Sequence, residues 1–164
     1  MPGRIALAAL ILVAGCARED GPAPPLSPAQ RAAEGAAAAR FLTEMAADVT
    51  REGPAAWARH FVPSQEFFMA ADGALVFPDG DSAARGVASL AKTLTGIELS
   101  FGSEVKVDPL TQDLVALGAP YHEVLTDADG RRTESRGYFT ALAEYRGGRW
   151  LLRDAHWSEP AARP

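Results

Sequence analysis

Apolar residues recur at helical spacing in the first half of the chain. Ser27, followed by Pro28 and by Gln30 three positions on, has the signature of a capping box, so we expect a long helix to begin here. The glycine–proline pair at residues 53–54 is expected to end it. The buried stripe of this helix consists of Phe41, Leu42, Met45 and Val49.

Two shorter helices and a hairpin are expected next. A short helix from Pro54 carries Trp57 and Phe61 and stops before a proline at position 63. The turn pair at residues 72–73, Asp-Gly, predicts a hairpin between strands at 66–70 and 74–77. A third helix is capped near Asp79 and closed by Gly96; its apolar face consists of Val87, Leu90, Ala91 and Leu94.

From residue 97 the apolar residues alternate, which predicts strands. We expect one strand over 97–107 with a bend at Gly102, and then three long strands joined by tight turns. The three long strands cover residues 114–126, 133–145 and 149–158.

A two-residue turn at Gly147 and Gly148 would set the register of the last hairpin. On that register one face holds the pairs Tyr145–Trp150, Ala143–Leu152, Ala141–Asp154 and Phe139–His156. The opposite face holds Tyr138, Thr140, Leu142, Leu151, Arg153, Ala155 and Trp157, and is too apolar for water. We therefore expect helices on one face and a second copy of the chain on the other, which makes a homodimer.

The N-terminus has the pattern of an export signal. Arg4 precedes an apolar run at 5–13 that is too short to cross a bilayer, and Ala14 and Gly15 precede Cys16. This resembles the lipobox of bacterial lipoproteins, where the chain is cut before the cysteine and lipid is attached to it. The alternative is an ordinary signal peptide with a chance cysteine.

The lipobox resemblance predicts three segments. Residues 1–15 would be a lipoprotein signal peptide, residues 16–28 a lipidated cysteine with a proline-rich tether, and residues 29–160 the folded domain. Ala17, rather than an aspartate, follows the cysteine, and by resemblance to Gram-negative sorting this favours the outer membrane, facing the periplasm. The partner at this end would be the membrane, through lipid on Cys16.

Composition narrows the possible functions. The chain has 16 basic and 21 acidic residues, a net charge of -5, and no cluster of basic residues, so nucleic-acid binding is disfavoured. Cys16 is the only cysteine, which leaves no intrachain disulfide. The three histidines lie on separate predicted elements, so no metal site is expected, and no motif calls for a cofactor.

A few polar residues are candidates for catalysis. Asp154 and His156 lie two apart on one strand and would share a face, as an acid–base pair does. Tyr121 and His122 are candidate hydrogen-bond donors. The alternative is a polar strand end with structural histidines, and His60 is expected at the surface or rim.

Aromatic residues suggest a wall for a small apolar ligand, although such residues also pack plain cores. The candidate ligand-binding residues are Trp57, Phe68, Phe139 and Trp150, and Trp157 is a further candidate for the aromatic wall.

The order of elements, together with several segments, resembles the nuclear transport factor 2-like superfamily and its SnoaL-like branch. The segments are Trp57-Ala58-Arg59-His60-Phe61, Glu66-Phe67-Phe68-Met69, Ala71-Asp72-Gly73, Gly86, Asp113-Leu114-Val115-Ala116-Leu117-Gly118, and the GRWLLRDAHWS ending at 148–158. The resemblance implies an α+β fold of the cystatin-like kind. In that fold a cone-shaped curved antiparallel sheet wraps around three N-terminal helices and leaves a pocket between them.

The superfamily includes both enzymes and non-catalytic modules, so the fold does not choose a function. Its isomerases carry a general-base aspartate at the end of the first strand, whereas this chain has no acid there before Asp72, a turn residue. The leading hypothesis is therefore a lipid-anchored small-molecule-binding or assembly module. The alternative is a SnoaL-like isomerase, dehydratase or hydrolase that acts on a hydrophobic small molecule.

Overall fold

A computed structural model describes residues 25–160 of the chain. The helices are α1 (Pro28–Glu52), the 3-10 helix η1 (Pro54–His60) and α2 (Gly80–Thr93). The strands are β1 (Phe68–Ala71), β2 (Ala74–Phe77), β3 (Leu94–Phe101), β4 (Lys106–Pro109), β5 (Leu114–Asp127), β6 (Arg132–Arg146) and β7 (Arg149–Ser158). Within this range no helix has the length and apolar character needed to span a membrane. The predicted signal peptide, Cys16 and most of the tether lie outside the described residues.

The capping box of α1 is confirmed. The Ser27 Oγ accepts the Gln30 backbone N–H at 3.3 Å, and the Gln30 side chain accepts the Ser27 backbone N–H at 2.9 Å. Gly53 ends the helix with φ +82°, a value that favours glycine. The predicted stripe, from Phe41 to Val49, is buried against the sheet.

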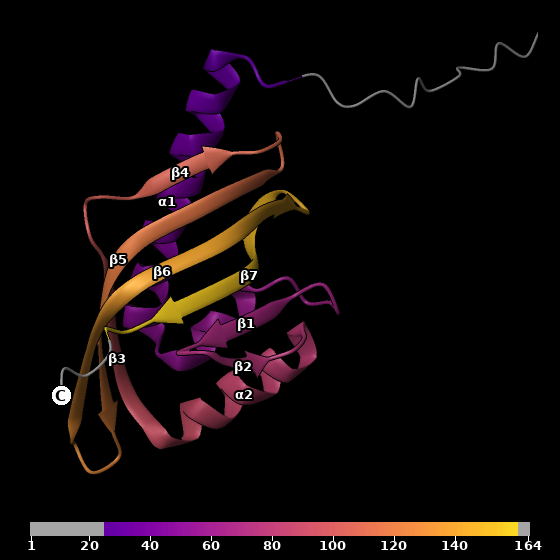
Figure 1. Ribbon diagram of the computed structural model, residues 1–164. Helices are drawn as coiled ribbons and strands as arrows, with labels where there is room; N and C mark the ends of the chain where they lie inside the picture. The colour runs from indigo at the N-terminus through magenta and orange to yellow at the C-terminus, as the bar shows by residue number, and fades with distance from the viewer. Residues whose placement is uncertain (1–24, 161–164) are drawn as a thin grey trace, which may run out of the picture.

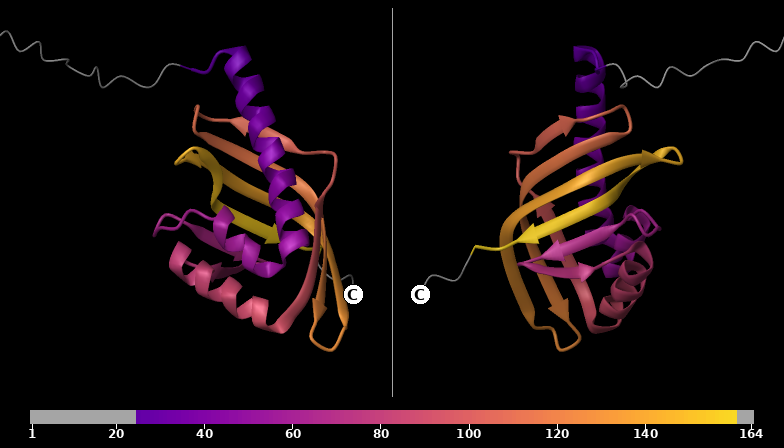
Figure 2. Two further views of the ribbon diagram at one scale, coloured as in Figure 1. Left: turned by 180° about the vertical axis from the view of Figure 1, so that it is seen from behind. Right: turned by 45° about the vertical axis from the view of Figure 1, so that its right-hand side comes forward.

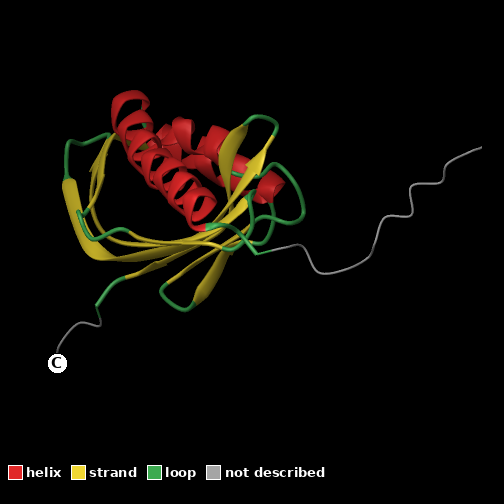
Figure 3. Ribbon diagram, turned by 90° about the horizontal axis from the view of Figure 1, so that it is seen from above, coloured by secondary structure: helices red, strands yellow, loops and turns green. Residues whose placement is uncertain are grey.

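A strongly curved sheet wraps around the helices (Figure 1). Its strands run in the order β2-β1-β7-β6-β5-β3, and β4 pairs with β5 beside β3. Figure 2 shows α1 lying across the sheet with η1 and α2 beside it, and Figure 3 shows the three helices on the same side of the sheet. We call the face toward the helices the inner face and the opposite one the outer face. The expected α+β architecture with three helices is confirmed.

The sheet differs from the expectation in one pairing and in two boundaries. β1 runs parallel to β7, so the sheet is mixed rather than wholly antiparallel. Helix α2 ends at Thr93, and Gly96 lies inside β3 rather than at a helix end. The single strand expected over 97–107 is two strands. After β3 the Gly102 N–H bonds the Pro120 carbonyl at 2.8 Å, the chain leaves the sheet, and β4 then pairs with β5 separately.

The predicted turn at Gly147 and Gly148 is confirmed, with φ values of +61° and +85°. Tyr145 pairs with Trp150 as predicted, and Ala143 pairs with Leu152. Leu142, which precedes Ala143 on β6, pairs with Asp154 rather than with Arg153. Arg153 is therefore an additional residue on β7, and the ladder has a β-bulge at this point.

The bulge reverses the faces of the end of β7, and the predicted pairs Ala141–Asp154 and Phe139–His156 are wrong. Phe139 pairs instead with Trp157, while Asp154 and His156 lie opposite Leu142 and Thr140 on the outer face. The inner face therefore gains Ala155 and Trp157, which the prediction placed outside. The outer face is more polar than expected, which removes part of the argument for a dimer.

Candidate functional site

An apolar pocket of about 380 Å³ opens on the inner face, near the β1–β2 hairpin and α2. This is within the usual size range of small-molecule sites. Most of its lining residues are apolar or aromatic; the lining consists of Trp57, Phe61, Met69, Ala71, Asp72, Val76, Phe77, Gly86, Val87, Leu90, Tyr121, Glu123, Ser135, Trp157 and Glu159.

Trp157 organises the aromatic part of this pocket. Its ring meets the ring of Trp57 edge-on, with 5.7 Å between centroids, and the ring of Tyr121 at 4.7 Å. Behind it, Phe139 is fully buried, with its ring centroid 4.5 Å from that of Trp157. Edge-to-face contacts of this kind stabilise one ring arrangement, so the wall is pre-formed.

Glu123 is the acidic residue on the inner side of β5. The inner positions of this strand alternate as Val115, Leu117, Ala119 and Tyr121, and Glu123 continues that row into the pocket. Burial and, to a lesser extent, the nearby charge of Glu159 raise the pKa of the Glu123 carboxyl to about 7. Near neutral pH this carboxyl can therefore either hold or release a proton.

The groups around Glu123 are polar but not basic. Burial is the main cause that raises the pKa of the Tyr121 phenol, and the nearby Ser135 side chain opposes the rise. Asp72 sits in the β1–β2 turn with φ +46°, and its Oδ1 accepts the Glu159 backbone N–H at 2.9 Å. This bond ties the end of β7 to the turn, and both acids line the pocket mouth.

The pocket therefore combines an aromatic wall with three carboxyl groups, and its lining residues include no lysine, arginine or histidine. Within residues 25–160, no group of three or more histidine, cysteine, aspartate or glutamate side chains is placed to hold a metal ion. The arrangement can bind an apolar molecule and can exchange a proton with it through Glu123.

The structure does not bring the predicted acid–base candidates into this pocket. Asp154 and His156 lie on the outer face of β7, and His122 lies on the outer face of β5. The His122 Nε2 is 2.9 Å from the Glu134 Oε1, a surface contact. Tyr121 does line the pocket, although the other three candidates do not.

Asp154 has a structural contact that explains its position. Its Oδ1 accepts the Leu142 backbone N–H at 3.0 Å, beside the bulge. Burial raises the pKa of this carboxyl, and the bond to Leu142 opposes the rise. The side chain thus satisfies a backbone group where the irregular ladder would otherwise leave it unpaired.

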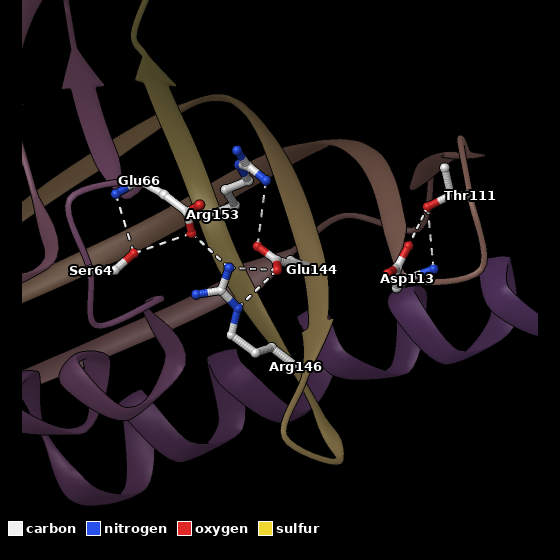
Figure 4. A network of polar contacts seen from close by, with 7 residues as sticks. All are labelled: Ser64, Glu66, Thr111, Asp113, Glu144, Arg146 and Arg153. Atoms are coloured by element: carbon white, nitrogen blue, oxygen red, sulfur yellow. Dashed lines mark hydrogen bonds and ion pairs between the residues drawn. The ribbon is translucent and has the colours of Figure 1, made fainter. Parts of the chain in front are cut away.

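The additional residue of the bulge joins a surface ion-pair network (Figure 4). Arg153 lies 3.7 Å from Glu144, and Arg146 bonds both Glu144, at 2.9 Å, and Glu66, at 2.6 Å. The network links the β6–β7 hairpin to the loop before β1. It is on the opposite side of the sheet from the pocket residue Trp157.

The predicted aromatic ligand-binding residues are spread over the molecule. Trp57 lines the pocket. Phe139 lies in the core behind it, and Phe68 is 47% exposed on the outer face, opposite Asp154. Trp150 lies in a separate open cleft beside the first half of α1, next to Tyr145.

His60 was expected at the surface or rim but is buried. Its Nε2 lies 3.2 Å from the Asp48 carboxylate, and burial lowers the pKa of its imidazole. The residue packs against Phe41 of α1, with 6.0 Å between ring centroids. It does not line the apolar pocket.

Sequence reasoning missed Glu123 and placed Trp157 on the wrong face. The signal for Glu123 was present, since a charged residue continues an inward row of apolar residues at a spacing of two. For Trp157 there was no such signal, because the bulge at Arg153 leaves no mark in the alternation.

No family model matches the sequence, and no curated protein matches it. Solved structures do match the fold. A nuclear transport factor 2-like superfamily protein from Salmonella enterica serovar Typhimurium superposes with a TM-score of 0.67 at 12% identity, covering 81% of this chain and 95% of that one. A protein titled putative scytalone dehydratase, from Novosphingobium aromaticivorans, gives a TM-score of 0.65 at 12% identity, covering 76% and 83%.

A hexachlorocyclohexane dehydrochlorinase, LinA type 2, gives a TM-score of 0.62 at 12% identity, covering 79% of this chain and 87% of that one. At these identities the similarity establishes the fold, which is nuclear transport factor 2-like, and does not transfer an activity.

Proposed function

We propose that this chain is a lipid-anchored envelope protein whose nuclear transport factor 2-like domain binds a small, largely apolar molecule. The main support for small-molecule binding is the pocket on the inner face, with its pre-formed aromatic wall of Trp57, Tyr121 and Trp157. The proposed acid–base pair, Asp154 and His156, lies outside that pocket, which favours binding over catalysis by those residues.

Saturable binding of a neutral apolar fluorophore, N-phenyl-1-naphthylamine, tests the pocket. Leu90→Trp adds bulk at a half-exposed lining position of α2 and should abolish binding. Leu110→Trp makes the same change at a leucine of similar exposure in the cleft beside α1 and should leave binding intact. Equal binding by both variants would contradict the proposal.

The anchor is a proposal that rests on the lipobox resemblance around Cys16, in the N-terminal region that the structure does not describe. The proposed site is the outer membrane, facing the periplasm, with the domain on a proline-rich tether. A Cys16→Ser variant should lose incorporation of a labelled fatty acid and leave the membrane fraction. If this variant still takes up the label and stays with the membranes, the anchor is elsewhere.

A homodimer through the outer face of the sheet is also proposed. Tyr138 and Phe68 are 40% and 47% exposed there, and a second copy of the chain would cover them. Light scattering should report a dimer for the wild type, and a monomer for Tyr138→Asp. A monomeric wild type would dismiss this part of the proposal.

A second function, in which the chain is an enzyme of SnoaL-like type, is favoured by one observation. Glu123 has a pKa of about 7 and lies beside Tyr121 in an apolar pocket, and this suits a general base that removes a proton from a bound substrate. Two structural neighbours are titled a putative dehydratase and a dehydrochlorinase. The test is turnover of hydrophobic alcohols or halides by the wild type. If Glu123→Gln abolishes this turnover but still binds the compounds, the enzymatic function is established.

A further inference from the structure

We infer that the molecule held in the inner pocket is a hydrophobic amine, bound as its ammonium ion with its apolar part against the aromatic wall. The inference rests on the proposed binding function and specifies the class of ligand. It draws on the shape of the cavity, the charges that line it and the aromatic rings around them.

The charges are of one sign. Glu123 lies inside the pocket, Asp72 and Glu159 lie at its mouth, and the other lining residues are uncharged. Within residues 25–160 no salt bridge reaches Glu123, whereas the surface carboxylates of Glu66 and Glu134 are paired with arginines. The ionised form of a carboxyl removed from water is stabilised by a positive partner, and here the ligand can supply it.

The aromatic rings suit the same kind of ligand. An ammonium group within about 6 Å of an aromatic ring is attracted to the ring face, and tryptophan is the best such partner. Trp57, Tyr121 and Trp157 surround the same space that Glu123 enters. The walls of α2 and the hairpin, with Val87, Val76 and Phe77, would hold the hydrocarbon part of the amine.

A metal ion fits the site less well. The described carboxylates form no ligand group of the kind that a metal needs. The walls are aliphatic and aromatic, and these contribute no oxygen ligands. An organic cation uses both the carboxylates and the walls.

Binding should weaken in acid. The charged or titratable groups that face Glu123 are Glu159 from the end of β7, Asp72 from the β1–β2 turn and Tyr121 on its own strand; α2 and η1 present uncharged residues. The ammonium pairs with the ionised carboxyl, which has a pKa of about 7, so lowering the pH from 8 to 6 should reduce the affinity for an amine about tenfold.

The test compares three probes with the same hydrocarbon part: 4-phenylbutylamine, 4-phenylbutanol and 4-phenylbutanoate. Their binding is measured by calorimetry at pH 8 and pH 6, without detergent, on the chain carrying Cys16→Ser, which lacks the proposed lipid. The amine should bind about tenfold more tightly than the alcohol at pH 8, and the carboxylate most weakly. At pH 6 the advantage of the amine should largely disappear.

Two variants complete the test. Glu123→Gln keeps the side-chain shape and should remove the preference for the amine while the alcohol still binds, which also shows that the variant is folded. Glu134→Gln makes the same change at an exposed carboxylate outside the pocket and should retain the preference. If amine and alcohol bind equally at both pH values, the amine inference is wrong but the binding function stands; if none of the probes binds, both are wrong.

Discussion

The pH dependence of unfolding reports directly on the Glu123 carboxyl. Its pKa rises from 4.5 in the unfolded chain to about 7 in the folded protein, mainly because of burial. At about 1.4 kcal/mol per pH unit, this difference makes ionisation cost about 3 kcal/mol more in the folded than in the unfolded state.

The sign follows from which state releases the proton first. Well below pH 4.5 the carboxyl is protonated in both states and has no effect. Between pH 4.5 and 7 the unfolded chain ionises first, so the free energy of unfolding falls as the pH rises. Above pH 7 both states are ionised, and the penalty stays constant.

Glu123→Gln removes this penalty, because glutamine resembles the protonated acid. The variant should be more stable than the wild type by about 3 kcal/mol at pH 8 and by about 1 kcal/mol at pH 5. Urea unfolding followed by tryptophan fluorescence measures both values, since Trp57 and Trp157 line the pocket. Glu134→Gln, a change at an exposed carboxylate, should show no such gain.

If the stabilities of the wild type and of Glu123→Gln stay parallel between pH 5 and pH 8, Glu123 is fully solvated. The reasoning about a charged group in an apolar pocket would then be refuted.

Three further changes test the packing around the site. Phe139→Ala removes a fully buried ring behind Trp157 and should lower the free energy of unfolding by about 3–5 kcal/mol. An unchanged midpoint of urea unfolding would contradict the packing described for this ring. Asp154→Ala leaves the Leu142 N–H unpaired and should lower the free energy of unfolding by about 1–2 kcal/mol. Asp154→Asn keeps an acceptor and should lower it by less. Equal losses of stability in the two variants would show that this hydrogen bond does not stabilise the fold. Gly86→Ala would place a Cβ 2.2 Å from the Phe77 ring, so it should displace that ring and weaken fluorophore binding; unchanged binding would show that the pocket does not depend on Phe77.

Local signals in the sequence predicted most of the element order, although β3 and β4 were expected as one strand. The capping box at Ser27 and the paired glycines at 147–148 each depend on a few adjacent residues, and both appear in the structure as expected. Gly96 was misassigned because a glycine after a helical pattern suits a helix end, whereas here the antiparallel pairing of β3 with β5 begins two residues earlier.

The site was harder to predict because one residue decides which face a strand presents. The alternation of β7 predicts Asp154 and His156 inward, and the bulge at Arg153 turns both outward and Trp157 inward. The bulge depends on contacts with β6 and on the hydrogen bond between Asp154 and Leu142. These two residues lie twelve positions apart in the chain, so local sequence patterns do not reveal the bond. Glu123 could have been found from its own strand, because it continues the inward row of apolar residues at a spacing of two.

Native mass spectrometry of the protein, extracted from its own membranes in a detergent that is stripped in the gas phase, tests most directly whether the inner pocket holds a ligand. The account predicts one small organic amine per wild-type chain and per Leu110→Trp chain, and none in Leu90→Trp, where the pocket is filled. A wild-type chain whose mass is that of the polypeptide and its lipid alone, or an adduct that Leu90→Trp retains, would contradict it.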